Sequence, residues 1–171
     1  DIAGLRGFAD EPDEGFIRDC IDSMRQETPE DFPLTKNGKK DYSFLAISGG
    51  SSNGAYGAGV LKGWSTHGSR PQFKTVTGRR NGGLLAPPAF LGSNYDHVIE
   101  KFYTSVSTKD IFIAKPIRGL FASSVATTAP LMKIIKENYT QEILDAIAVE
   151  HNKGRRLYIG TTNLDSQRMV L

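Results

Sequence analysis

The fold is constrained most strongly by two strand–turn–helix junctions. At each of them, a short apolar strand leads through a glycine-rich turn into a helix. Tyr42–Ile47 is an apolar run that ends in glycines, and Gly54–His67 follows with apolar residues at helical spacing. Phe73–Thr77 is a second apolar run, and after another glycine turn a short helix is predicted over Gly82–Leu91. Because strands that alternate with helices form parallel sheets, we expect these two strands to be parallel neighbours.

The rest of the chain continues this alternation. Helical spacing recurs in three later segments, and two further strands are predicted near the end. These are the helices Tyr95–Thr104, Pro130–Asn138 and Thr140–His151 and the strands Arg155–Thr161 and Gln167–Leu171. The last strand has no turn after it, so we expect residues 41–171 to be the N-terminal part of a longer α/β domain.

Two segments lie outside this pattern. Residues 1–40 carry ten acidic and six basic residues, and we predict a helical extension with an apolar stripe from Phe16 to Met24, followed by the linker Thr28–Lys40. Ile111–Thr128 mixes apolar and basic residues. Its more common interpretation is core with two surface charges, and its alternative is contact with an anionic lipid surface.

Composition excludes several classes of protein. The net charge of +2 gives no sign of nucleic-acid binding, and one cysteine excludes a disulfide framework or a cysteine-based metal site. No apolar run approaches the roughly 18–20 residues of a membrane-spanning helix. We expect neither metal nor cofactor. The sequence leaves the oligomeric state and export open, since any signal peptide or lipoprotein anchor would precede Asp1.

The first glycine-rich turn, Gly49–Gly54, has the composition of an anion site. Glycines let backbone N–H groups face a ligand, and the following helix presents its positive end. No Gly-Lys-Ser or Gly-Lys-Thr closes the turn, so it is not a nucleotide-binding P-loop. Either it holds a phosphate or an oxyanion, or its glycines serve close helix packing.

Several motifs in order resemble bacterial patatin-like phospholipases. The first is Phe44-Leu-Ala-Ile-Ser-Gly-Gly-Ser-Ser-Asn-Gly-Ala-Tyr-Gly-Ala-Gly-Val-Leu-Lys-Gly-Trp64. The others are Arg70-Pro-Gln-Phe73, Leu84–Gly92, Ala129-Pro-Leu131, Gly154-Arg-Arg-Leu157 and Thr161-Thr-Asn-Leu-Asp165. The resemblance covers nearly all of residues 42–171, and a weaker resemblance is found at Ile2–Pro12.

The resemblance implies a three-layer αβα fold that hydrolyses acyl esters of lipids with a Ser–Asp dyad and without a histidine. The oxyanion loop would contain Gly49, Gly50, Ser51 and Gly54, with Ser51 in place of a third glycine. The serine would lie in a Gly-x-Ser-x-Gly elbow after the second strand, between Gly78 and Gly82. The dyad aspartate would lie in a later Asp-Gly-Gly or Asp-Gly-Ala turn. Lipid or acyl-ester substrates are implied, and peripheral contact with a lipid surface is a further expectation.

The chain departs from this pattern at the nucleophile. The elbow reads Gly78-Arg-Arg-Asn-Gly82, so Arg80 stands where the serine should be, and residues 1–171 contain no Asp-Gly turn. A guanidinium stays protonated and cannot attack an ester. We interpret Asp165 as structural, and His67, His97 and His151 as surface residues. As it stands, the chain is therefore expected to be inactive.

Alternatives remain for the nucleophile and for the arginines. Gly50-Ser-Ser-Asn-Gly54 is itself a Gly-x-Ser-x-Gly motif, which makes Ser52 a rival nucleophile or else a helix-capping hydroxyl. Arg79 and Arg80 have three interpretations. They belong to a solvated turn, they form a cationic clamp for phosphate or carboxylate, or the sequence is altered at this point. The leading hypothesis is a lipid acyl hydrolase scaffold. The alternative is a non-catalytic relative that binds acyl or phosphate groups.

Overall fold

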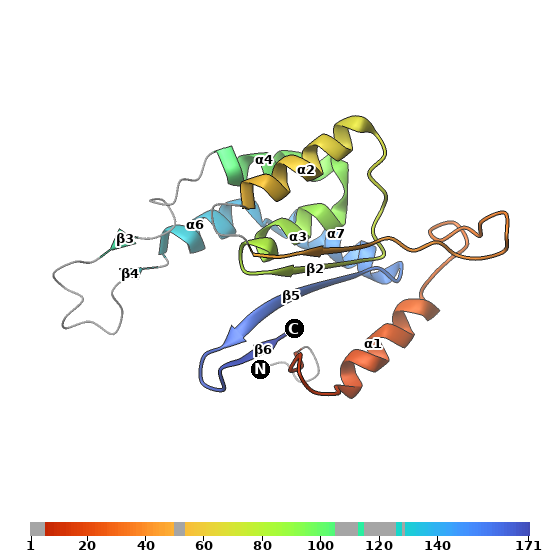
Figure 1. Cartoon of the computed structure of the whole chain (residues 1–171), viewed down its shortest axis with the longest axis horizontal. Coiled ribbons are helices and arrows are strands. Elements are labelled where there is room, and N and C mark those ends of the chain that lie inside the picture. Colours follow the sequence, from red (N-terminus) through yellow and green to blue (C-terminus); the bar gives the residue numbers. More distant parts are fainter. Residues whose placement is uncertain (1–5, 50–53, 105–112, 115–125, 128) are drawn as a thin grey trace.

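The computed structural model describes residues 6–49, 54–104, 113–114, 126–127 and 129–171. Its main sheet has four strands in the order β1-β2-β5-β6, shown with the surrounding helices in Figure 1. The helices are α1 Glu14–Arg25, α2 Gly54–His67, α3 Asn81–Leu91, α4 Asp96–Thr104, α6 Ala129–Asn138 and α7 Gln141–Asn152, with a 3₁₀ turn η2 at Ser93–Tyr95. The strands are β1 Phe44–Ile47, β2 Thr75–Arg79, β3 Ile113–Ala114, β4 Ala126–Thr127, β5 Arg156–Asn163 and β6 Arg168–Val170.

The predicted α/β fold with a mostly parallel sheet is confirmed. β1 and β2 are parallel neighbours, with Leu45 opposite Val76, and β2 is parallel to β5. Only β6 runs antiparallel, as the second strand of a hairpin with β5. β2 begins and ends two residues later than predicted, because its pairing with β5 continues through Gly78 to Arg79.

One face of the sheet carries most of the core. Val76 of β2 and Phe90 of α3 are fully buried there, and partly buried apolar side chains of β1, β5 and α7 pack against them. A second cluster joins α2, α3 and α4 over β1. α3 is continuous through Pro87 and Pro88, although both prolines lack the N–H that an interior helical residue donates. Burial of these turns against the sheet offsets the missing hydrogen bonds.

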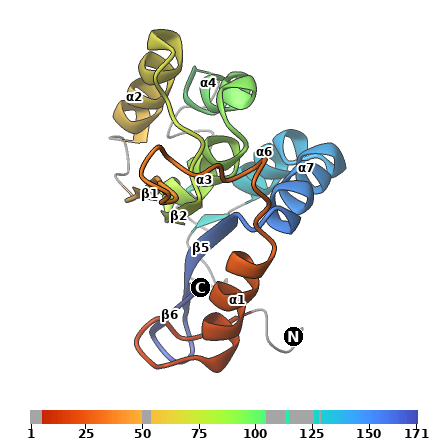
Figure 2. The same ribbon diagram turned by 90° about the vertical axis from the view of Figure 1, so that its right-hand side faces the viewer.

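On the opposite face, α1 lies against β5, whereas Phe44 of β1 is exposed. Side chains alternate along a strand, so Arg156 and Tyr158 of β5 point away from the core that Leu157 and Ile159 join. Both contact Asp19 of α1 through hydrogen bonds. Figure 2 shows α1 beside β5 and β6, at the end of the molecule away from α2 and α4.

The segment before α1 is attached to the edge of the sheet. Gly7 and Leu171 exchange two backbone hydrogen bonds, of 3.2 and 3.0 Å, and Ala9 donates a third to Met169. The first α1 turn is capped by Asp13, whose carboxylate accepts a 2.7 Å hydrogen bond from the Phe16 N–H. The predicted helix in the acidic extension is therefore confirmed.

The stretch Ile111–Thr128 lies mostly outside the described residues. Within it the structure describes β3 and β4, which pair antiparallel as a separate two-stranded sheet. The two interpretations of the remaining residues of that stretch stay predictions.

Candidate functional site

The turn between β2 and α3, residues Gly78–Gly82, is called the elbow below. β2 ends at Arg79 and α3 begins at Asn81, so Arg80 alone reverses the chain direction. Its backbone angles are φ 54 and ψ −127, a conformation that side-chain-bearing residues rarely adopt. The Arg80 carbonyl then accepts a 2.8 Å hydrogen bond from the Gly83 N–H. Position 80 is thereby held at the N-terminal end of an eleven-residue helix.

The two elbow glycines are required by contact distances. A Cβ on Gly78 would lie 2.5 Å from the Gly82 carbonyl oxygen and 2.6 Å from the Ala86 Cβ. A Cβ on Gly82 would lie 2.4 Å from the Ile47 carbonyl oxygen at the end of β1. Real Cβ atoms do not make such contacts, so the spacing of these glycines follows from how tightly β2 turns into α3.

The end of β1 meets the elbow directly. The pairing of Ile47 with Gly78 brings both strand ends to one edge of the sheet. A Cβ on Gly49 would lie 2.5 Å from the Arg80 Cβ and 2.9 Å from the Arg79 carbonyl oxygen. The start of the first glycine turn therefore touches the residue at the nucleophile position.

Most of the predicted oxyanion loop lies outside the described residues. This holds for Gly50, Ser51 and the rival nucleophile Ser52, whose roles stay predictions. Gly54 is described, and it is buried as the first residue of α2. Within the described residues, contact between the first glycine turn and the elbow is therefore seen at Gly49 alone.

A cavity of about 360 Å³ adjoins the elbow at the carboxyl ends of β2 and β5. It is lined by the apolar residues Leu84 of α3 and Ile159 of β5 and by Arg79 and Arg80. The remaining lining residues are Gly83, Gly160, Thr161 and Thr162. Both arginines are exposed, and their guanidinium groups have no hydrogen bond or ion pair with any residue that the structure describes.

Six other arginines of the described chain are differently placed. Arg70, Arg155 and Arg156 are paired with carboxylates at 2.6–2.7 Å. Arg18, Arg25 and Arg168 also have acidic partners. Arg79 and Arg80 thus present positive charge to the cavity without a neutralising carboxylate among the described residues. Two guanidinium groups beside a helix N-terminus can bind a carboxylate or a phosphate.

Reasoning from sequence missed the contribution of β5 to this cavity. Thr161 and Thr162 line it because Arg79 pairs with Gly160, which places the end of β5 beside the elbow. The expected parallel pairing of β2 with β5 could have revealed this contribution, because parallel pairing brings the carboxyl ends of both strands to one edge of the sheet.

The remaining candidate residues lie elsewhere. Asp165 is exposed in the hairpin turn, where its N–H donates to the Asn163 side chain. His67, His97 and His151 are exposed, as predicted, and none lines the elbow cavity. Within the described residues there is no cluster of metal-ligating side chains, and no helix there is long and apolar enough to span a bilayer.

Comparisons with known proteins add no assignment. No family model, no curated protein and no solved structure matches this chain.

Proposed function

We propose that this chain is the N-terminal part of a patatin-like lipid acyl hydrolase, with the elbow as its reaction site. The observation that carries the proposal is the single-residue turn at position 80, with its positive φ and two close-packed glycines. A sharp, strained strand-to-helix turn is how Gly-x-Ser-x-Gly hydrolases expose a nucleophile above a parallel sheet. Helices on both faces of the sheet agree with the three-layer architecture of that family.

Each part of the site would have a defined role in ester hydrolysis. A serine at position 80 would bond to the ester carbonyl carbon and pass its proton, through the dyad aspartate, to the departing alcohol. Water would then release the fatty acid by the reverse proton path. Backbone N–H groups of the turn that begins at Gly49 would hold the oxyanion.

Arg80 removes the nucleophile from this arrangement. The chain as it stands therefore does not hydrolyse esters at the elbow. The backbone at residue 80 nevertheless keeps the conformation that a nucleophile there would need. The second candidate function follows from the same residue: Arg79 and Arg80, unpaired in the described chain, bind the carboxylate of a fatty acid or a phosphate. Leu84 and Ile159 in the lining of the cavity would contact the first carbons of the fatty-acid chain.

Restoring the serine tests the proposed reaction. We expect no ester turnover and no fluorophosphonate labelling of residues 1–171, because both dyad residues are missing. Arg80→Ser in the complete gene product, where the later Asp-Gly turn is expected, should yield hydrolysis of a p-nitrophenyl acyl ester. Changing that later aspartate to asparagine is the matched control and should abolish it. Labelling of the unmodified chain at Ser52 would instead identify the rival elbow and overturn the assignment.

The anion-binding candidate has a separate measurement. Decanoate should bind the chain more tightly than methyl decanoate in a calorimetric titration. Arg80→Ala should weaken decanoate binding about tenfold or more, since a hydrogen bond to a charged group contributes ~1.5–3 kcal/mol. Arg18→Ala on the exposed surface of α1 is the control and should leave the affinity unchanged. Equal affinities for the acid and its ester would rule this candidate out.

A further inference from the structure

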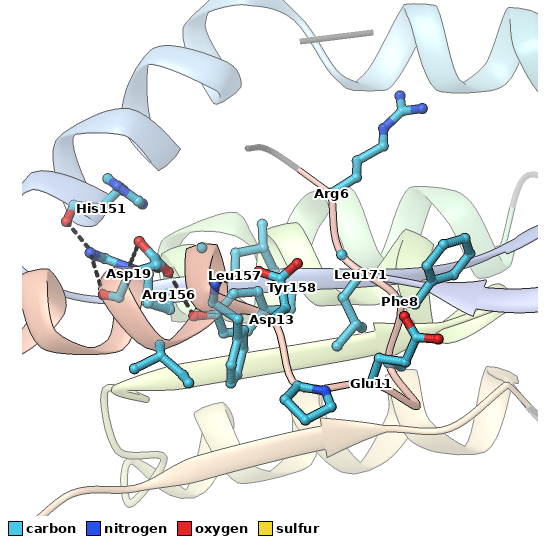
Figure 3. Close-up of a pocket in the computed structure, with 16 residues that line it drawn as sticks. Arg6, Phe8, Glu11, Asp13, Asp19, His151, Arg156, Leu157, Tyr158 and Leu171 are labelled. Atoms are coloured by element: carbon cyan, nitrogen blue, oxygen red, sulfur yellow. Dashed lines mark hydrogen bonds and ion pairs between the residues drawn. The ribbon is translucent and has the colours of Figure 1, made fainter. Parts of the chain in front are cut away.

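A second cavity, of about 550 Å³, lies between α1, β5 and the segment of residues 6–13, which is called the strap below. Figure 3 shows the strap residues Phe8 and Glu11 on one side of it and Asp19 with Arg156 on the other, with Tyr158 and Leu171 between them. Small-molecule sites typically have volumes of ~300–1,000 Å³. The volume therefore suits a small organic ligand.

This cavity is separate from the elbow. Arg156 and Tyr158 line it from the face of β5 that α1 covers, whereas Ile159 points to the opposite face and lines the elbow cavity. The sheet thus stands between the two cavities. A ligand here would not depend on the chemistry of position 80.

The lining is mainly hydrocarbon. The apolar side chains come from the strap, from α1 and from the residue after β6: Phe8, Ala9, Pro12, Phe16, Ile17 and Leu171. Phe16 and Tyr158 also pack with their ring centroids 5.2 Å apart, which gives one wall a rigid aromatic surface. An apolar ligand would gain the free energy of removing this surface from water.

The charged groups around the cavity are already occupied, and Arg6, which also lines it, is not without a partner either. Asp19 accepts two hydrogen bonds from Arg156, at 2.7 and 2.8 Å, and Glu11 is paired with Arg168 at 2.7 Å. Asp13 caps α1. Desolvation and the charge of Arg156 lower the pKa of His151 below its usual value, so that its ring is neutral at pH 7. A charged ligand would find no partner among these groups.

One polar group retains hydrogen-bonding capacity. The Tyr158 hydroxyl donates a 2.7 Å hydrogen bond to Asp19, which leaves its oxygen able to accept. Burial and the Asp19 carboxylate raise the pKa of Tyr158 far above its ordinary value, so the phenol stays protonated. A hydroxyl or N–H of a ligand can therefore donate to it.

The strap is fastened in a way that keeps this cavity open without a ligand. Beyond its backbone bonds to β6, Arg168 lies 3.8 Å from the centre of the Phe8 ring and 2.7 Å from an Asp10 carboxylate oxygen. A preformed site loses little conformational entropy on binding. We propose that this cavity binds a neutral, apolar small molecule that carries one hydroxyl or N–H donor.

The fluorescent amine N-phenyl-1-naphthylamine has this chemistry and serves as the probe. We expect saturable binding with an increase in fluorescence, and displacement by 1-decanol at about tenfold lower concentration than by decanoate. Ala9→Trp should fill the cavity and lower probe affinity about tenfold or more, without removing the backbone bond of Ala9. Val60→Trp on exposed α2 is the matched control and should leave probe binding unchanged.

Three outcomes would overturn the proposal. One is an unchanged probe affinity in a folded Ala9→Trp variant and in Ile17→Asp, which places a charge in the same wall. Another is equal displacement by decanol and decanoate. The third is a sedimentation mass of two chains that falls to one chain in Ala9→Trp, because the cavity would then be covered by a second copy. The elbow tests are independent of all three, since none of these substitutions touches residues 78–82.

Discussion

Arg80 occupies a backbone conformation that costs a residue with a side chain about 1–3 kcal/mol. The flanking positions 78 and 82, where a side chain would collide, are glycine, yet the strained position itself is not. The side chain of Arg80 also passes over Gly49, where an added Cβ would lie 3.0 Å from the Arg80 Cδ. A side chain kept at a strained position beside a cavity is typical of a functional residue.

The elbow glycines give a residue-scale prediction. Gly82→Ala should lower the free energy of unfolding by about 2 kcal/mol or more, because the new methyl group would collide with the backbone of Ile47. Gly63→Ala in the exposed part of α2 is the matched control. No atom lies within 4 Å of a Cβ there, so alanine should raise stability by ~0.5–1 kcal/mol. Urea unfolding of both variants measures the difference, and a loss in Gly63→Ala equal to that in Gly82→Ala would contradict it.

Among the elements, the end of α1 is joined to the start of β2 by a buried charge cluster. The Lys74 ammonium donates to the Glu27 carboxylate and to the carbonyl oxygens of Ser23 and Gly154. Glu27, with a side chain 1% exposed, also accepts from Lys40 and from the Tyr42 hydroxyl. Desolvation lowers the pKa of Lys74, and desolvation together with Glu27 raises the pKa of Tyr42 to about 12.

The cluster predicts a pH dependence of stability. Burial opposes ionisation of Glu27, but its hydrogen bonds from Lys40, Lys74 and Tyr42 outweigh this, so its pKa lies below the ordinary 4.5. Because the folded pKa is the lower one, the stability from this group is present above about pH 4.5 and is lost as the pH falls. Glu27→Gln should therefore destabilise the chain by about 3 kcal/mol at neutral pH, since Lys74 stays buried without its carboxylate.

The difference between the two proteins measures this effect. Urea unfolding of the unmodified chain and of Glu27→Gln, repeated from pH 7 downward, should show the two stabilities converging as the pH falls below about 4.5. Other carboxylates titrate in both proteins, so their contributions cancel in the difference between the two stabilities. A difference that stays constant over this range would show that Glu27 does not titrate as argued.

At the scale of the whole molecule, α1 lies against β5 on the second face of the sheet, and polar contacts attach it there. Asp19 holds Arg156, whose side chain is 3% exposed, together with the Tyr158 hydroxyl. The Ser23 hydroxyl donates a 2.6 Å hydrogen bond to the Gly154 carbonyl. Part of the apolar stripe of α1, at Ile17, Ile21 and Met24, is meanwhile exposed. The helix therefore depends on its acidic side for its position.

This attachment predicts unequal effects of two neighbouring substitutions. Asp19→Ala should destabilise the chain by about 3–5 kcal/mol, because it leaves Arg156 buried without its partner. Asp22→Ala on the same helix is the control: its partner Arg25 is exposed, so its loss should stay within about 0.5 kcal/mol. Thermal and urea unfolding give both values. Equal effects of the two substitutions would mean that α1 is not attached through Asp19.

Much of the fold could be predicted from the sequence, because it depends on local periodicity. The apolar runs at β1 and β2 indicated buried strands, and the spacing in α2 and α4 indicated helices. Alternation of the two then required a parallel sheet with both glycine turns at one edge. A turn after the second strand was predicted from Gly78, because glycine ends a strand readily. That Gly78 and Gly82 flank an elbow came from the resemblance to patatin-like proteins.

Only the tertiary structure decided which polar residues are buried and which distant segments meet. Charged residues are expected at the surface from sequence, yet Lys74 and Arg155 lie inside because backbone carbonyls and carboxylates of other elements satisfy them. The pairing of the strap with β6 joins the two ends of the described chain, and no local pattern encodes it. Thr161 and Thr162 reach the elbow through strand register alone. Local sequence determines periodicity and turn geometry, whereas burial of charge and contacts between remote segments depend on how the elements pack.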